Sequence, residues 1–98
     1  MNVNEFETFM KKLSEYVSVK NENKFKRTIT YESLNGDDVV FYFPAINRIV
    51  ITHKDLTISG DDLDIHVDFE SNELYVNVFH KKEMIGDVVF KCRGVKNE

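Results

Sequence analysis

The chain has 98 residues and a formal net charge of -4, with 42% hydrophobic and 31% charged residues. This composition is typical of one globular domain and argues against a disordered chain. Because like charges repel, a net negative charge disfavours general binding to nucleic acid and favours a basic protein partner. The single cysteine, Cys92, excludes an intramolecular disulfide.

The N-terminal residues lack the basic and apolar regions of a signal peptide, and the longest apolar run, Val39 to Phe43, is too short to cross a membrane. We therefore expect a cytoplasmic protein that does not bind membranes. Asn, Lys, Ile, Phe and Val are abundant, whereas alanine occurs once, at Ala45. Such a bias is typical of AT-rich coding sequences, as in low-GC bacteria and their phages.

An amphipathic helix is predicted over residues 3–19. With a period of about 3.6 residues per turn, the apolar side chains of this segment gather on one stripe and the polar ones on the other side. The polar stretch at residues 20–23 favours a turn after the helix. The apolar stripe comprises Val3, Phe6, Phe9, Met10, Leu13, Tyr16 and Val17.

Beyond residue 23 the hydrophobic pattern alternates with a period of two, which predicts strands. Asn35-Gly36 predicts a hairpin turn, and Pro44 predicts either the end of a strand or an edge position. The predicted strands in the first part of this region are 24–32, 39–43, 48–52 and 56–59.

The strongest pairing prediction concerns the hairpin around Ser71-Asn72. A two-residue turn there sets Val67 opposite Val76 and keeps the apolar residues of both strands on one face. The last strand is predicted over residues 86–93. A three-residue loop before it would place Val76 opposite Val88.

These elements predict an α+β fold in which an N-terminal helix packs on one face of a six- or seven-stranded, mostly meandering antiparallel sheet. No repeat, low-complexity tract or linker interrupts the chain, so we expect a single domain over residues 1–98. The helix is expected to meet the apolar face of the hairpin, which carries Ile65, Val67, Val76 and Val78.

The other face of this hairpin combines carboxylates with aromatic rings. In the predicted register Asp68 lies opposite Tyr75, and Asp64 lies opposite Phe79. A purely solvated face rarely carries such rings, so this face is predicted to be a docking surface or a dimer interface. A second small core beneath a curled sheet is the alternative. The candidate partner-binding residues are Asp64, His66, Asp68, Glu70, Glu73, Tyr75 and Phe79, with Ile85 and Val89 beside them.

The sequence contains no convincing catalytic, metal-binding or cofactor motif. Asp64, His66 and Asp68 alternate on one strand face, but only Asn77 is near enough to serve as a fourth metal ligand. An open strand face also provides no cleft for a carboxylate acid/base pair. We therefore expect no metal, no cofactor and no enzymatic activity.

A basic stretch, Lys24-Phe25-Lys26-Arg27, stands apart from this acidic hairpin. Together with the aromatic residues 41–43 it is similar to a stacking platform for single-stranded nucleic acid. In a strand, however, Phe25 would lie on the face opposite Lys24 and Lys26. Direct nucleic-acid binding is therefore not expected.

The sequence thus predicts a non-enzymatic, small acidic binding protein, such as an inhibitor or an immunity-type or phage-encoded antagonist that docks a basic protein partner. Two alternatives stay open. A pocket between the helix and a curled sheet, lined by Tyr42 and Phe79, would make the protein a small-ligand carrier. Burial of Tyr75 and Phe79 across a two-fold axis would make it a structural homo-oligomer.

Overall fold

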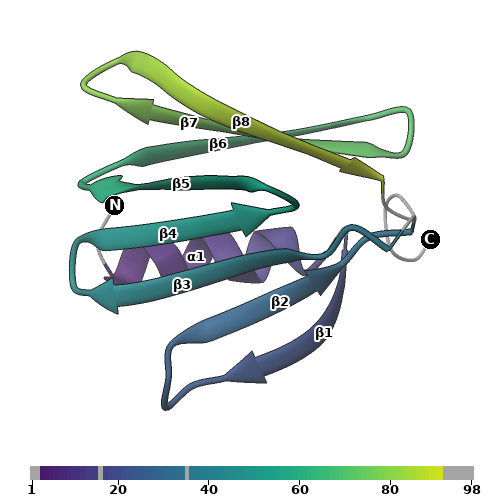
Figure 1. The fold of residues 1–98 in the computed structure, drawn as a ribbon, viewed down its shortest axis with the longest axis horizontal. Coiled ribbons are helices and arrows are strands. Elements are labelled where there is room, and N and C mark those ends of the chain that lie inside the picture. Colours follow the sequence, from purple (N-terminus) through teal and green to yellow (C-terminus); the bar gives the residue numbers. More distant parts are fainter. Residues whose placement is uncertain (1–2, 16, 35, 92–98) are drawn as a thin grey trace.

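The computed structural model describes residues 3–15, 17–34 and 36–91, and this part of the chain forms one helix and eight strands (Figure 1). All paired strands are antiparallel and adjacent in sequence. They form a five-stranded sheet, β1-β2-β3-β4-β5, and a three-stranded sheet, β6-β7-β8. The elements are α1 (Val3–Leu13), β1 (Ser18–Asn23), β2 (Thr28–Glu32), β3 (Val39–Ala45), β4 (Arg48–His53), β5 (Leu56–Asp61), β6 (Asp64–Glu70), β7 (Glu73–His80) and β8 (Glu83–Lys91).

The antiparallel α+β architecture agrees with the prediction, but the single sheet of six or seven strands is wrong. The break lies between β5 and β6, at Asp62 and Leu63. Asp62 has a positive φ of 54°, and its N–H donates a hydrogen bond to the carbonyl oxygen of Asn47 at 2.7 Å. Leu63 is buried, with 1% exposure. The chain therefore leaves the first sheet at a turn whose next side chain enters the core.

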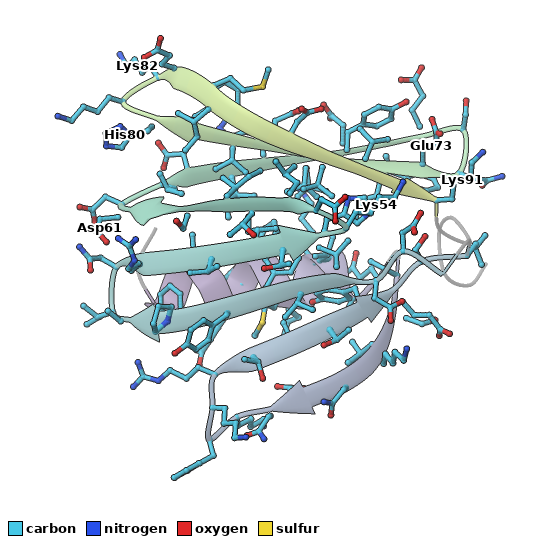
Figure 2. All side chains as sticks on the ribbon, in the orientation of Figure 1. Lys54, Asp61, Glu73, His80, Lys82 and Lys91 are labelled. Atoms are coloured by element: carbon cyan, nitrogen blue, oxygen red, sulfur yellow. The ribbon has the colours of Figure 1, made fainter. Side chains whose placement is uncertain are left out.

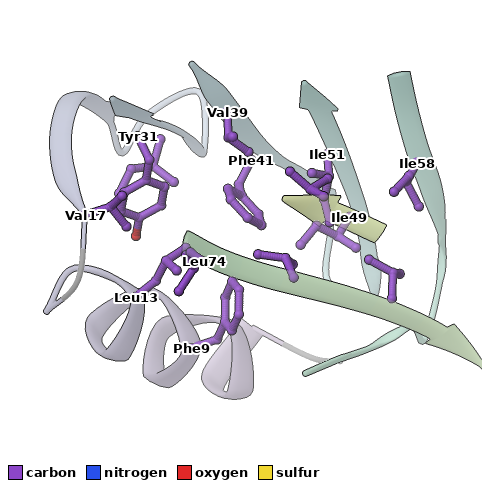
Figure 3. Close-up of a cluster of buried hydrophobic side chains, with 14 of the residues drawn as sticks. Phe9, Leu13, Val17, Tyr31, Val39, Phe41, Ile49, Ile51, Ile58 and Leu74 are labelled. Carbon is purple, nitrogen blue, oxygen red and sulfur yellow. The ribbon is translucent and has the colours of Figure 1, made fainter. Parts of the chain in front are cut away.

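The helix and the three-stranded sheet together cover one face of the five-stranded sheet. The ring centroids of Phe9 in α1 and Phe41 in β3 lie 5.5 Å apart. On the other side, Ile58 of β5 packs directly over Gly86 of β8, since a Cβ built on Gly86 would lie 2.8 Å from the Ile58 Cδ1 atom. Figure 3 shows these side chains, with Leu74 of β7, entering one continuous core.

The helix is shorter than the predicted range of 3–19, because it ends at Leu13. A hydrogen bond of 3.2 Å from the Val17 N–H to the Leu13 carbonyl oxygen continues the turn, and Val17 remains buried. Ser18 then pairs with Glu32 as the first residue of β1. Phe9, Leu13 and Val17 belong to the core and Met10 packs against it; the side chains of Val3 and Phe6, and Tyr16 as a whole, lie outside the described residues.

The helix is expected to meet the apolar face of the β6–β7 hairpin, and it also lies against the five-stranded sheet. Phe41 contacts Phe9, and the Tyr31 hydroxyl donates a hydrogen bond to the Met10 carbonyl oxygen at 3.1 Å. The connection from α1 to β1 is short, which keeps the helix next to β2 and β3. The expected hairpin face enters the same core through its four residues, Ile65, Val67, Val76 and Val78.

The region around residues 20–32 differs most from the prediction. Residues 20–23 belong to strand β1, and residues 24–27 form a turn instead of the start of a strand. β1 is an edge strand with almost no buried residue, so its sequence carries no alternating hydrophobic pattern. Only the second half of the predicted strand, Thr28–Glu32, is a strand.

The centre of the five-stranded sheet follows the prediction more closely. β2 and β3 pair across the Asn35-Gly36 segment, but the ladder ends at Tyr31 and Val39, so the connection is longer than a two-residue turn; Asn35 itself lies outside the described residues. Pro44 lies in the central strand β3, where the register to β4 shifts between Tyr42 and Ala45. Proline is tolerated there because it sits at an irregular point of the ladder.

The register of the three-stranded sheet is confirmed. Val67 pairs with Val76, and Val76 pairs with Val88. The loop before β8 is a two-residue turn at Lys81-Lys82 instead of the predicted three-residue loop. A register shift next to Val78 compensates for the difference, so Val76 still pairs with Val88. The last strand begins at Glu83 and is described as far as Lys91, so the predicted end at Arg93 lies outside the described residues.

Tyr31 forms a polar contact inside the core. Its hydroxyl lies 3.1 Å from the Met10 carbonyl oxygen and 3.3 Å from Ser14 Oγ, and its side chain is fully buried. Burial raises the pKa of Tyr31 to about 12. The Tyr31 hydroxyl therefore joins the end of α1 to β2, and it must stay protonated to donate this hydrogen bond.

The packing of β8 on β5 predicts a specific double-mutant result. Gly86→Ala should destabilise the fold by about 1–3 kcal/mol, because the new methyl group meets Ile58. Ile58→Val removes the Cδ1 atom, so the double variant should lose less stability than the sum of the two single variants. Ile29→Val is the matched control and should be additive with Gly86→Ala. Denaturant unfolding compares these five variants with the wild type, and additivity at Ile58 would contradict this packing.

The raised pKa of Tyr31 predicts that the free energy of unfolding decreases at alkaline pH. The folded pKa lies above the unfolded value of about 10, so the contribution of Tyr31 is complete below that pH and is lost as the pH rises toward about 12. Tyr31→Phe should reduce stability near neutral pH by about 1 kcal/mol and flatten the decrease above pH 10. Thermal melts of the wild type and of Tyr31→Phe across this pH range test the prediction. Parallel dependence of the two melting temperatures on pH would contradict it.

Candidate functional site

The solvent-facing side of the three-stranded sheet, here called the β6–β8 outer face, is built by strand alternation. In β6 and β7, every second side chain points away from the core, because the intervening residues are turned toward it. The face consists of Asp64, His66, Asp68 and Glu70 from β6, Glu73, Tyr75, Asn77 and Phe79 from β7, and Met84, Ile85, Asp87, Val89 and Lys91 from β8.

The structure brings all seven predicted partner-binding residues to this one face. Asp64 pairs with Phe79, and Asp68 pairs with Tyr75, as predicted. The rings of His66 and Phe79 lie 5.0 Å apart at their centroids, inclined by 56°. Glu70 and Glu73 pair beside the Ser71-Asn72 turn. The face is therefore a continuous arrangement of carboxylates around two aromatic rings.

Within the described part of the chain, these rings do not belong to a second core. Tyr75 and Phe79 are only half-buried, and beside them Met84 is 54% exposed and Val89 is 37% exposed. Within residues 3–15, 17–34 and 36–91, no helix or strand covers this face. The apolar atoms of the β6–β8 outer face are consequently available to another molecule.

One end of the face holds two carboxylates that directly oppose each other. A Glu–Glu pair across two strands is electrostatically unfavourable. Glu73 is partly compensated, because the Tyr75 hydroxyl donates a hydrogen bond to Glu73 Oε1 at 2.8 Å and Lys91 Nζ lies 4.0 Å from Glu73 Oε2. The same hydrogen bond raises the pKa of Tyr75. Glu70 retains uncompensated negative charge at this end.

Figure 2 shows how charge is distributed along the three-stranded sheet. Glu73 and Lys91 lie at the end just described, whereas His80 and Lys82 lie at the other end, toward Asp61. Asp61 already forms an ion pair of 3.1 Å with Arg48. The strongest negative character of the face is therefore at the Ser71-Asn72 end.

Three residues that sequence reasoning did not assign to the face belong to it, all on the edge strand β8. Asp87 pairs with Asn77 and adds a carboxylate, Met84 pairs with Phe79 and extends the apolar part, and Lys91 pairs with Glu73. The predicted register already implied the position of Asp87. Met84 could not be placed, because the register shift after Val78 is not visible in the sequence.

The other groups of residues considered in the sequence do not add to this face. In the part of the chain that the structure describes, no group of three His, Cys, Asp or Glu side chains could hold a metal ion. Tyr42 lies on the outer side of the five-stranded sheet and Phe79 on the outer side of the three-stranded sheet, so they do not line a common pocket. The turn at Lys24–Arg27 is far from the β6–β8 outer face, at the opposite side of the view in Figure 1.

Comparison with known protein families, curated proteins and solved structures finds no match for this chain. Across the described residues, no helix has both the length and the apolar character needed to span a membrane.

The outward position of the rings predicts that they are dispensable for folding. Tyr75→Ala and Phe79→Ala should each cost about 1 kcal/mol or less, as expected for partly exposed side chains. Leu74→Ala, which empties a fully buried site on the same strand, should cost about 2–5 kcal/mol. Denaturant melts compare the three variants. Unfolding of the Phe79→Ala protein at the level of Leu74→Ala would show that the ring is part of the core.

Proposed function

We propose that the protein is a non-enzymatic binding protein that docks a basic protein partner on the β6–β8 outer face. The observation that carries this proposal is an uncovered sheet face on which carboxylates surround half-buried aromatic and aliphatic side chains. Docking sites commonly combine an apolar centre with a charged rim. An inhibitor or an immunity-type antagonist, encoded by a bacterium or a phage, would fit this arrangement.

The two kinds of side chain would have different tasks. Tyr75 and Phe79 offer rigid apolar area with few rotatable bonds, which is typical of the residues that dominate binding energy. The carboxylates, led by Asp68 and Glu70, would attract a basic partner and orient it during approach. A partner cation placed between Glu70 and Glu73 would also offset the repulsion between these two carboxylates, which would add to the free energy of binding.

A basic partner is favoured by the charge balance of the face. Its strands carry Asp64, Asp68 and Glu70 on β6 and Asp87 on β8, and none of these four carboxylates has an ion pair among the described residues. Among the described carboxylates, Lys91 forms its ion pair with Glu73, at 4.0 Å. An enzyme that handles nucleic acid is one kind of partner with a complementary basic groove, since a row of carboxylates can occupy a site meant for phosphates.

The test begins with capture of partners by the tagged protein from the cells that encode it, followed by binding kinetics with the purified partner. Tyr75→Ala or Phe79→Ala should weaken binding by at least about 1–2 kcal/mol, mainly through faster dissociation. Charge reversal at Asp68 and Glu70 should slow association and flatten its dependence on salt.

Tyr42→Ala is the matched control, because Tyr42 is an exposed aromatic residue on the other sheet. It should leave the interaction unchanged. A partner that is acidic, or one whose binding survives both Tyr75→Ala and Phe79→Ala, would contradict the proposal. Sedimentation of the protein alone separates the homo-oligomer alternative: a dimer that dissociates in Phe79→Ala would assign this face to self-association.

A further inference from the structure

The turn between β1 and β2 presents a phenyl ring to solvent. Phe25 is 96% exposed, the highest value among the described large hydrophobic residues. A turn of this kind needs polar or small residues, and a solvated ring contributes nothing to the core. Folding therefore does not account for Phe25.

The backbone of this turn is fixed by hydrogen bonds. The Asn23 side-chain oxygen accepts from the Lys26 N–H at 2.9 Å, and the Arg27 N–H donates to the Lys24 carbonyl oxygen at 3.3 Å. The Arg27 carbonyl oxygen in turn accepts from the Phe43 N–H at 3.0 Å, which ties the turn to β3. The Phe25 ring is thus carried by an ordered backbone, which lowers the entropy lost on binding.

Three cations flank the ring without partners. Lys24, Lys26 and Arg27 are exposed, and within the described residues none of them forms an ion pair. In residues 3–15, 17–34 and 36–91, by contrast, Lys20, Arg48, Lys54 and Lys91 form ion pairs. The turn is therefore a local positive site on an acidic protein.

A hollow of about 480 Å³ lies next to the turn. The hollow is shallow and open to solvent, so it suits an extended ligand that lies along the surface. Its wall combines rings, hydroxyl groups and cations, a mixture suited to a flat polar group that carries negative charge. The lining residues are Phe25, Lys26, Arg27, Thr28, Tyr42, Phe43 and Pro44.

We propose that this turn and its hollow bind single-stranded nucleic acid. Phe25 stacks on a base, Lys26 and Arg27 neutralise the adjoining phosphates, and the hydroxyl groups of Thr28 and Tyr42 face the base or sugar. The sequence-based objection, that Phe25 and the lysines occupy opposite strand faces, does not apply, because the segment is a turn. The hollow favours this ligand over a bilayer surface, which would require several apolar side chains projecting beyond the cations.

The net charge of the protein does not oppose this site. The carboxylates of the β6–β8 outer face lie on the far side of the molecule, whose longest dimension is 34 Å. Screening in physiological salt acts over about 8 Å, so their repulsion on a strand held at the turn is weak. The proposal is independent of the protein-docking function, since the two sites share no residue.

The test measures fluorescence anisotropy of a labelled oligothymidylate and of the matching oligouridylate, each of about 15 nucleotides, over a range of salt concentrations that includes physiological ionic strength. Phe25→Ala should reduce affinity by about fivefold or more, as stacking residues do. Phe25→Tyr should retain binding and Phe25→Leu should weaken it as Phe25→Ala does, because only tyrosine keeps an aromatic face. Lys26→Gln and Arg27→Gln should each reduce the slope of log affinity against log salt by about 0.7.

Lys82→Gln and Met84→Ala are the matched controls, a cation and an exposed apolar residue on the other sheet, and neither should change binding. Because Phe25 is exposed, all its variants should melt like the wild type, so a loss of binding reports the site itself. Absence of binding to either oligonucleotide, equal binding by Phe25→Leu, or binding to anionic phosphatidylserine vesicles in preference to the oligonucleotides would overturn the proposal.

Discussion

One face of the five-stranded sheet must be kept from water, and the helix can cover only part of it. An eleven-residue helix is about 16 Å long and about 10 Å wide, whereas five strands spaced by about 4.8 Å extend over about 19 Å. α1 therefore shields β2 and β3, where Phe41 and Tyr31 meet it. The remaining apolar surface, which includes Ile58, is covered when the three-stranded sheet turns back at Leu63. The outward position of Tyr75 and Phe79 is a consequence of this arrangement.

The sequence predicts the three-stranded sheet well because its pattern and its turns agree. Strict alternation around Ser71-Asn72 permits one register, and a shift by one residue would expose Val67 and bury Asp68. The site residues on β6 and β7 were therefore placed correctly. In contrast, β1 is nearly all exposed, so no hydrophobic period marks it, and the alternation at Lys24–Arg27 wrongly predicts a strand where the chain forms a turn. The division into two sheets depends on Asp62 and on packing between distant strands, neither of which has a local signature.

Two surfaces of opposite charge remain open once the core is closed. The β6–β8 outer face carries carboxylates around rings, and the turn at Lys24–Arg27 carries cations around Phe25. The net charge of -4 describes neither surface, because it averages over both. A protein of this size that separates its charges in this way can contact a basic protein with one side and a polyanion with the other, without either contact obstructing the other.

The three-stranded sheet lies on β5 and turns Phe79 outward. Proton–proton distances in solution test this packing most directly. A nuclear Overhauser experiment with labelled methyl groups should show cross-peaks between the Ile58 methyl groups and the Gly86 α-protons. The Phe79 ring should show cross-peaks to His66 and none to the methyl groups of Ile49 or Ile51. Cross-peaks from the Phe79 ring to those core methyl groups, with no contact between Ile58 and Gly86, would contradict the packing on which the proposed docking face rests.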